Sequence, residues 1–290
     1  RNVTKVYPNG THALNGINLT VDKGEFVFIV GASGAGKSTF MRMLAGILRP
    51  DKGSVLIDGI PVYESEEAKR KFFYISDEQF FLLNATPKDM GNFYKNFFAE
   101  FDEKKYVDCL EKFSLDSRRK INTFSKGMKK QAAFWLTIAT HPELLVLDEP
   151  VDGLDPVMRR QIMSLILADV EKNGTTVLVS SHNLRELEDI CDHVGIMDHG
   201  KMLLERSLAD MQGATHKLQM VGQLPEGLEV LHESSSGRLK TYVVRGSAEE
   251  ITAKLNAANP TYFDVLPLSL EEIFIYELGG VNYEVKDILL

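Results

Sequence analysis

A glycine-rich stretch near the N-terminus constrains this chain more than any other feature. The apolar run Phe26–Val30 leads into Gly-Ala-Ser-Gly-Ala-Gly-Lys-Ser-Thr at residues 31–39, and an apolar, helix-like segment follows at 40–46. A buried strand, a glycine loop and a helix in this order form the context that the phosphate-binding pattern G-x-x-x-x-G-K-[ST] requires. The order therefore predicts an α/β fold with a phosphate-binding loop at its centre.

The residue types of this loop have physical reasons. Glycines let backbone N–H groups curl around phosphate oxygens, and the helix N-terminus adds partial positive charge. We expect Lys37 to reach the β- and γ-phosphates and the Ser38 hydroxyl to bind Mg²⁺. A chance glycine turn is the alternative, which the Lys-Ser pair disfavours. The other positions expected to contact the nucleotide are Gly31, Ala32, Ser33, Gly34, Ala35, Gly36 and Thr39.

Length and charge narrow the class of protein. A chain of 290 residues favours one large domain and a small one. The net charge of −8 disfavours a nucleic-acid partner, which needs a basic surface. No apolar run is long enough to span a membrane. Cys109 and Cys191 have no metal-binding or redox spacing, and so few cysteines fit a reducing, cytoplasmic location.

Strand and helix signals alternate after the loop. Apolar strands are predicted at 72–75, 144–147 and 175–179, with helices at 126–139 and 155–174. This alternation predicts a mostly parallel sheet. The segment 86–140 is helical and rich in aromatic residues at helical spacing, which favours either a small helical core or an exposed groove for a partner helix.

Polar residues at the ends of two predicted strands are candidate catalytic groups. Asp148 and Glu149 follow one buried strand, at the sheet edge where ligands of α/β proteins bind. We expect Asp148 to hold Mg²⁺ and Glu149 to polarise the attacking water. His182 follows the next strand and can reach the γ-phosphate. A solvated loop and a structural histidine are the simpler alternatives.

These residues together resemble the ATP-binding subunit of ABC transporters over residues 1 to about 212. Tyr7 lies where that family stacks adenine, and Phe124–Lys129 resembles the family signature. The segment 144–149 resembles the strand that ends in the Mg²⁺ aspartate and the catalytic glutamate. Gly153–Asp155 resembles the loop that crosses between subunits, and Ser181-His182 the switch histidine.

The resemblance implies a P-loop NTPase (RecA-like) core with a mostly parallel sheet and an inserted helical subdomain at about 86–140. It implies ATP and Mg²⁺ as cofactors and a head-to-tail dimer with a second ATP-binding subunit, homo- or heterodimeric. Ser125 and Gly127 would contact the γ-phosphate held by that second subunit. It also implies permease partners on separate chains and a peripheral location at the inner face of the cell membrane.

Two positions depart from the family pattern. Lys126 replaces the first glycine of the signature, and the resulting Ser-Lys-Gly-Met resembles bacterial ABC-2-type exporter ATPases. The position expected to hold the glutamine of the glutamine loop is Asp77, while Gln79 lies two residues on. Asp77 can bind Mg²⁺ as a hard oxygen ligand. Which of the two residues serves this role stays open.

The leading hypothesis is an ATPase that energises an ABC-2-type exporter. The alternative is an ATP-gated interaction protein of the cell-division type, because the first forty residues also resemble that ABC ATPase; a soluble ABC protein of translation or repair is disfavoured. Residues 213–290 are predicted to form a small α/β accessory domain for dimerisation or regulation. Within it, residues 268–274 resemble the tail of ABC-2 exporter ATPases.

Overall fold

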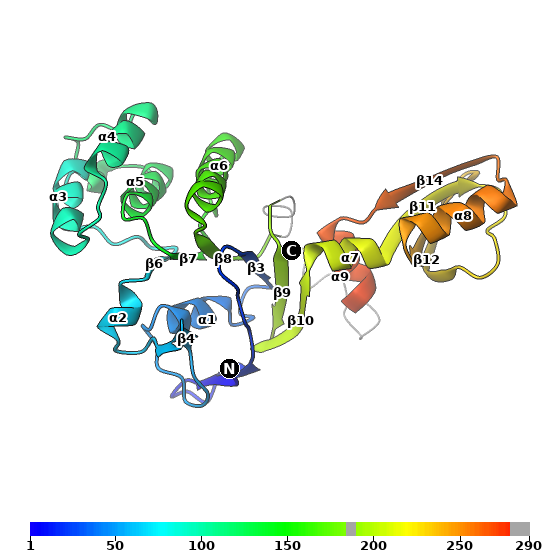
Figure 1. Ribbon diagram of the computed structural model, residues 1–290, viewed down its shortest axis with the longest axis horizontal. Helices are drawn as coiled ribbons and strands as arrows, with labels where there is room; N and C mark the ends of the chain where they lie inside the picture. Colours follow the sequence, from blue (N-terminus) through cyan, green and yellow to red (C-terminus); the bar gives the residue numbers. More distant parts are fainter. Residues whose placement is uncertain (184–189, 279–290) are drawn as a thin grey trace. The chain divides into compact units, whose positions relative to one another are not determined.

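The computed structural model describes residues 1–183 and 190–278 and divides the chain into two compact units. The first unit comprises residues 1–182 and 195–204, and the second comprises 183–194 and 205–290, of which 184–189 and 279–290 lie outside the described residues. Figure 1 shows the elements of both units along the chain. The predicted candidate site residues all belong to the first unit.

A six-stranded sheet forms the centre of the first unit. Its strands, in order across the sheet, are β10 (Lys201–Ser207), β9 (His193–Asp198), β3 (Phe26–Val30), β8 (Thr176–Ser181), β7 (Leu144–Asp148) and β6 (Phe72–Ile75). The pairs β3–β8, β8–β7 and β7–β6 are parallel. Every residue of β3 and β8 is buried, as expected for central parallel strands covered on both faces. The predicted mostly parallel sheet is confirmed.

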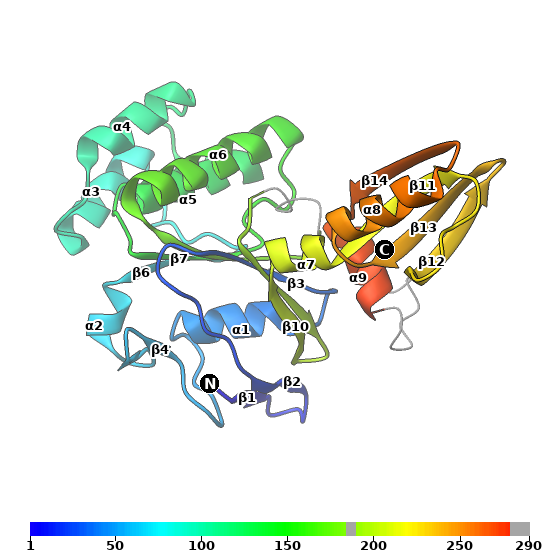
Figure 2. The ribbon, with the colours of Figure 1, turned by 45° about the vertical axis from the view of Figure 1, so that its right-hand side comes forward.

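Helices cover both faces of this sheet. In Figures 1 and 2, α1 and α2 lie on one side, and α5 and α6 lie on the other. The helices of this unit are α1 (Lys37–Leu44), α2 (Glu66–Lys69), α3 (Pro87–Phe97), α4 (Glu103–Lys112), the 3₁₀ turn η1 (Ile121–Thr123), α5 (Lys126–Ile138) and α6 (Pro156–Asn173). Two short antiparallel pairs complete it: β1 (Val3–Val6) with β2 (His12–Ile17), and β4 (Leu56–Ile57) with β5 (Ile60–Pro61).

Side-chain caps set where the helices near the candidate site begin. The Ser125 hydroxyl accepts a hydrogen bond from the Met128 N–H at the start of α5. The Asp155 carboxylate accepts two at the start of α6, where proline occupies the first helical position. These caps place α5 and α6 directly after the loops that carry candidate site residues.

The aromatic residues of the helical segment form a half-buried cluster. Tyr94 of α3 stacks on Phe73 of β6, with the ring centroids 5.7 Å apart, and on Phe98 at 5.5 Å. Phe97 is 69% exposed. The cluster therefore supplies a small core that ties α3 to the edge of the sheet, while at least one of its members faces outward.

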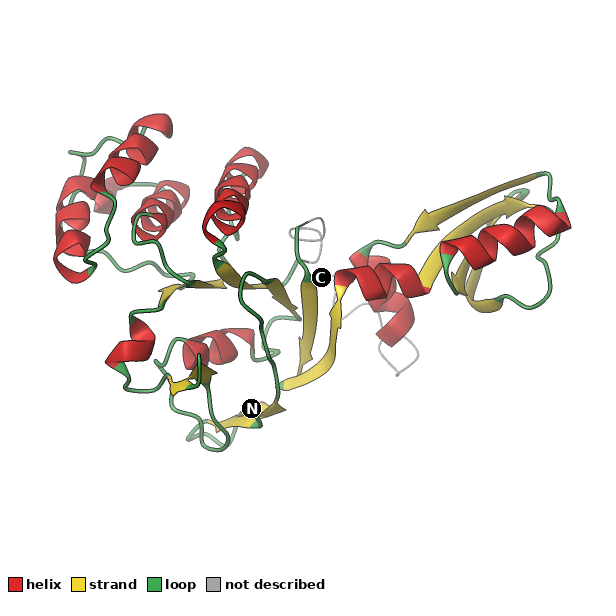
Figure 3. Ribbon diagram, in the orientation of Figure 1, coloured by secondary structure: helices red, strands yellow, loops and turns green. Residues whose placement is uncertain are grey.

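The second unit is built on a four-stranded antiparallel sheet (Figure 3). Its order is β12 (Glu229–Ser236), β13 (Leu239–Arg245), β11 (Thr215–Val221) and β14 (Tyr262–Pro267). Its helices are α7 (Leu208–Ala214), α8 (Ala248–Ala258) and α9 (Leu270–Leu278). Leu218 and Met220 of β11 pack with Leu255 of α8 in one hydrophobic cluster. Lys217 alternates with these buried residues along β11, and its ammonium pairs with the carboxylate of Glu272 of α9.

None of the helices within residues 1–183 and 190–278 combines the length and hydrophobicity that crossing a bilayer requires.

Candidate active site

The predicted phosphate loop lies between β3 and α1, and two of its glycines, Gly31 and Gly36, leave no room for a side chain. A Cβ atom on Gly31 would lie 2.2 Å from the Met197 carbonyl oxygen. A Cβ on Gly36, whose φ is +103°, would lie 2.5 Å from the Ala13 carbonyl oxygen. Backbone atoms cannot yield to such contacts. At Gly34 a Cβ would have no described atom within 4 Å, so glycine is favoured there by its φ of +84° and not by lack of space.

Lys37 lies inside this loop. Its ammonium donates to the carbonyl oxygens of Gly31 at 2.7 Å and Ala32 at 3.2 Å, and it lies 3.6 Å from Glu149 Oε1. Burial lowers the pKa of Lys37, and the negative charges of Glu149 and Asp148 oppose that shift. A desolvated ammonium at the first turn of α1 is a strong site for a phosphate anion.

Asp148 is a buried carboxylate surrounded by hydroxyl groups. Ser38 Oγ donates to Asp148 Oδ1 at 3.1 Å, and Ser180 Oγ donates to the same oxygen at 2.7 Å. Tyr74 Oη lies 3.5 Å from Oδ2. Burial and the Asp148 charge raise the pKa of Tyr74 to about 12, which keeps its hydroxyl protonated as a donor. The carboxylate is therefore held in one orientation.

The Ser38–Asp148 pair has the chemistry that Mg²⁺ requires. A hydroxyl and a carboxylate are hard oxygen ligands, and Mg²⁺ is commonly held by one or two carboxylates together with substrate phosphates and water. Among the described residues, no group of three or more His, Cys, Asp or Glu side chains forms a complete metal cage. The pair fits an ion that arrives together with a nucleotide.

Glu149 has a left-handed backbone with a φ of +48°. Its N–H donates to the Ser180 carbonyl oxygen at 3.1 Å, which ties the end of β7 to the end of β8. Its Oε2 lies 2.9 Å from His182 Nδ1. The structure thus brings Lys37, Glu149 and His182 together at the carboxyl edge of the parallel strands, as predicted from their positions after those strands.

Tyr7 contacts Thr39, the last residue of the loop. The Tyr7 hydroxyl and Thr39 Oγ1 are 3.1 Å apart. This contact anchors the tyrosine, whose side chain is partly buried, at the first turn of α1. Ser33, by contrast, is exposed at the tip of the loop.

Ser125 and Gly127 lie at the start of α5, and the structure does not join them to the phosphate loop of the same chain. Within the described residues, Ser125 Oγ bonds the Met128 N–H, and the nearest atom to a Cβ on Gly127 would be Leu154 Cδ2 at 3.4 Å. Both positions are therefore clear of their own loop.

Asp77 and Gln79 occupy the polar loop after β6. Asp77 Oδ1 lies 3.2 Å from Lys130 Nζ and 3.7 Å from Lys126 Nζ. The Gln79 amide folds back and donates to the carbonyl oxygens of Ser76 and Asp77 at 3.0 and 2.7 Å. Of the two, Asp77 is the residue whose side chain reaches toward α5.

The sequence reasoning missed Tyr74, Ser180 and Lys130. The first two lie near the carboxyl ends of β6 and β8, the same signal that identified Asp148 and His182, so they could have been found. Lys130 follows Lys126 by four residues on α5, which predicts that the two share one helix face. Nothing in that spacing indicates which loop they face.

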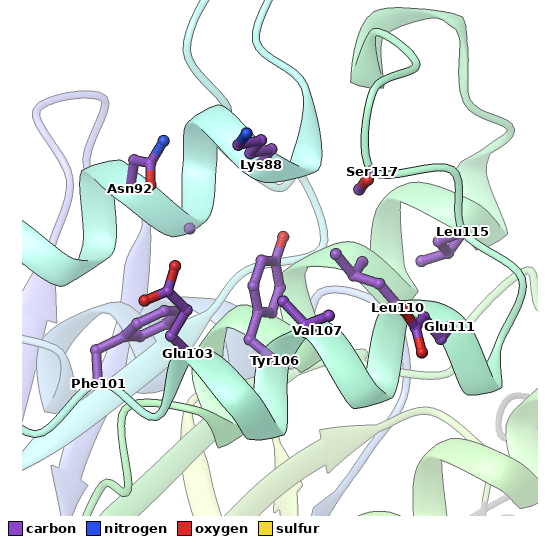
Figure 4. Close-up of a pocket in the computed structure, with 11 residues that line it drawn as sticks. Lys88, Asn92, Phe101, Glu103, Tyr106, Val107, Leu110, Glu111, Leu115 and Ser117 are labelled. Atoms are coloured by element: carbon purple, nitrogen blue, oxygen red, sulfur yellow. The ribbon is translucent and has the colours of Figure 1, made fainter.

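A separate cavity of about 180 Å³ lies between α3 and α4 (Figure 4). Tyr106 points from α4 toward α3, where its hydroxyl donates to the Pro87 carbonyl oxygen at 2.9 Å. A Cβ on Gly91 would lie 2.8 Å from the Tyr106 ring. The cavity is lined by residues 88–117 and shares no residue with the phosphate loop.

The fold and this site define a P-loop nucleoside triphosphatase. Residues 14–152 match the family described as ABC transporter. The chain is 27% identical over 277 residues to the ABC transporter ATP-binding protein YtrB of Bacillus subtilis, covering 94% of this chain and 95% of YtrB. It is 37% identical to the energy-coupling factor transporter ATP-binding protein EcfA of Methanocaldococcus jannaschii, covering 69% of this chain and 75% of EcfA.

Among solved structures, one similar protein is the ATP-binding cassette MJ0796, a dimer in a post-hydrolysis state bound to ADP and Pi. The TM-score is 0.64 at 27% identity, over 72% of this chain and 97% of that one. The chain therefore belongs to the ATP-binding proteins of ABC transporters, and it is an ABC-type ATPase with ATP as its nucleotide. The predicted family and P-loop fold are confirmed.

Proposed function

We propose that this chain is the ATP-hydrolysing subunit that energises a membrane ABC exporter through ATP-driven closure of a dimer. The observation that carries the proposal is the convergence of Lys37, Glu149 and His182, with Glu149 2.9 Å from His182 and 3.6 Å from Lys37. In this proposal Lys37 binds the β- and γ-phosphates, Glu149 polarises the attacking water, and His182 contacts the γ-phosphate.

We further propose that Ser38 and Asp148 hold Mg²⁺, since their oxygens already lie 3.1 Å apart. The bound ion would neutralise charge that develops on the phosphates. Asp77 as a further oxygen ligand stays a prediction, because its carboxylate is paired with Lys130. Tyr7 would stack on adenine, and the backbone of residues 31–39 would bind the phosphates.

The dimeric state of MJ0796 supports a second ATP-binding subunit as a partner. Ser125 and Gly127 would then complete the site of the opposite subunit. This agrees with their contacts within the described residues, which are with Met128 and Leu154 and not with their own phosphate loop. In the proposed organisation, residues 1–212 form the ATP-binding domain, with its helical subdomain at about 86–140, and residues 213–290 form the accessory domain.

The Ser-Lys-Gly-Met signature supports an exporter of the ABC-2 type. We propose permease subunits on separate chains and a location at the inner face of the cell membrane. Affinity purification from detergent-solubilised membranes tests this part. A partner with six membrane spans supports the exporter, whereas one with four spans and a large external domain supports the cell-division-type alternative.

The catalytic assignment is tested by Glu149→Gln, which removes the charge but keeps the side-chain shape. We expect kcat for ATP hydrolysis to fall by about 100-fold or more, as for loss of a general base, while ATP affinity stays within about twofold. Phosphate release and binding of a fluorescent ATP analogue measure the two quantities. Turnover at the wild-type rate would refute the role of Glu149.

A further inference from the structure

The ammonium of Lys130 is buried in α5, and each of its three N–H groups has an acceptor. Lys130 Nζ donates to the carbonyl oxygens of Glu149 at 2.9 Å and Asp152 at 2.8 Å. The third acceptor is Asp77 Oδ1 at 3.2 Å. The Lys130 side chain is only 1% exposed, whereas that of Asp77 is 47% exposed. Since an ammonium has three donors and no acceptor, this arrangement uses its full capacity.

The two carbonyl groups lie at the ends of the turn that follows β7. The Asp152 N–H approaches the Glu149 carbonyl oxygen at 3.4 Å, which is long for a hydrogen bond. Glu149 itself has a φ of +48°, a conformation that is uncommon for a non-glycine residue and costs free energy. Lys130 bridges both ends of this turn and, together with the hydrogen bond from the Glu149 N–H to the Ser180 carbonyl oxygen, restrains it.

Asp77 supplies the counter-charge for the buried lysine. A buried ammonium without an opposite charge is strongly unfavourable, and the carboxylate from the loop after β6 provides one. Lys126 joins the same cluster, 3.7 Å from Asp77 Oδ1 and 3.3 Å from Asp152 Oδ2. The cluster links the loop after β6, the start of α5 and the turn after β7.

We propose that Lys130 is a positioning residue for ATP hydrolysis: it fixes the turn at residues 149–152 so that the Glu149 carboxylate faces the reacting phosphate. Asp77 acts through Lys130 by holding the ammonium against that turn. This inference rests on the proposed role of Glu149. In this proposal Asp77, at the glutamine-loop position, has a function that does not require direct contact with Mg²⁺.

The first test replaces Lys130 with methionine, which keeps the length and apolar stem but removes the donors and the charge. Its matched control is Lys104→Met, an exposed lysine of α4, for which the described part of the chain provides no ion pair. We expect kcat to fall by about 10- to 100-fold in Lys130→Met, because displacement of a reacting group by about 1 Å has an effect of this size. The KM for ATP should stay within about twofold.

Lys130→Arg keeps a positive charge and hydrogen-bond donors, and it should recover part of the lost turnover. A general loss of folding would lower the amount of active protein in both variants and would not distinguish arginine from methionine. Turnover in Lys130→Met equal to that in Lys104→Met would overturn the proposal. So would a rise in KM without a fall in kcat.

The second test is a double-mutant cycle with Asp77→Asn, a change on a half-exposed loop that is independent of whether Lys130→Met folds. We expect Asp77→Asn alone to lower kcat by about three- to tenfold, and the double variant to match Lys130→Met, because both changes break one chain of contacts. Wild-type turnover in Asp77→Asn overturns the proposal. Effects that multiply in the double variant also overturn it and favour a separate role for Asp77 as a Mg²⁺ ligand.

Glu149→Gln, assayed beside these variants, separates the proposed catalytic role of Glu149 from the proposed positioning role of Lys130. Wild-type turnover in Glu149→Gln removes the basis of the proposed function and of this inference together. An inactive Glu149→Gln with a fully active Lys130→Met overturns the positioning role alone.

Discussion

The candidate site of the first unit and the β12–β13 hairpin of the second unit place their polar side chains in different settings. In the first unit, residues far apart in the sequence meet in a buried site; Ser38 and Asp148, for example, are 110 residues apart. In the second unit, the pairs Lys240–Glu233 and Arg245–Glu229 join residues 7 and 16 positions apart, and their side chains are about half exposed. The first arrangement brings polar and charged groups together in one buried site, and the second leaves separate charged pairs on the surface.

Strand direction explains this difference. Parallel strands all end at the same edge, so the residues after β7 and β8 meet the loop after β3 regardless of their distance in the sequence. Antiparallel neighbours such as β12 and β13 place sequence-adjacent residues opposite one another, and their charged pairs lie on the surface. A chemical site is therefore expected in the first unit, and a packing or interaction role in the second.

The largest expected effect comes from removing one buried charge of the first unit, that of Lys37. Lys37→Met keeps the volume of the side chain but deletes the ammonium inside the phosphate loop. We expect ATP affinity to fall on the order of 100-fold or more, because several charge-assisted hydrogen bonds to phosphate are lost. Titration calorimetry with ATP and Mg²⁺ measures the change. Lys240→Met deletes an equal charge from the second unit and should leave ATP affinity unchanged. A similar loss of ATP affinity in both variants would contradict the contrast between the two units.

The next effect is on the stability of the second unit. Leu255 is fully buried in the cluster between α8 and the antiparallel sheet, so Leu255→Ala should destabilise that unit by about 2–5 kcal/mol. Amide hydrogen exchange in β13 and α8 measures this loss, while ATP affinity should remain within about twofold. Val230→Ala, at a site that is 38% exposed, is the control with little expected change. Reduced ATP affinity in Leu255→Ala at unchanged exchange would contradict a packing role.

The elements around the phosphate loop could be predicted from the sequence because local signals and global fold agree there. Apolar runs predicted β3 and β7, and helices were predicted from about residues 126 and 155, where the structure shows the caps Ser125 and Asp155. Their agreement is typical of a sequence whose local preferences match its fold. The ends of parallel strands then located Asp148 and His182, without any knowledge of distances.

Other features of the structure could not be predicted from local sequence patterns. The pairing of Lys130 with Asp77 depends on how α5 packs beside the loop after β6, which no local pattern encodes. The edge strand β12 is almost wholly exposed and shows little apolar alternation. The start of α9 did carry a signal that was missed: Ser269 and Glu272 form a reciprocal capping box, with hydrogen bonds of 3.1 and 3.0 Å.

The smallest expected effect concerns the ion pair between Lys217 of β11 and Glu272 of α9. Burial alone would raise the pKa of Glu272, but the Lys217 ammonium and the Ser269 N–H outweigh it, so the pKa lies below its ordinary value. A carboxylate with a lowered folded-state pKa contributes stability above its unfolded-state pKa of about 4.3 and loses that contribution as the pH falls through the folded-state value.

Glu272→Gln removes the charge but keeps an oxygen that can accept from the Ser269 N–H. We expect it to destabilise the second unit by about 0.5–1 kcal/mol at pH 7, because the two side chains are 25% and 30% exposed and solvent screens the pair. The difference from wild type should shrink below about pH 4 as Glu272 is protonated. Denaturant unfolding from pH 7 to pH 3 measures both values. The Glu233 carboxylate is 51% exposed, so Glu233→Gln should destabilise the unit less at pH 7. An equal or larger destabilisation would show that burial does not set the strength of charged pairs in this unit.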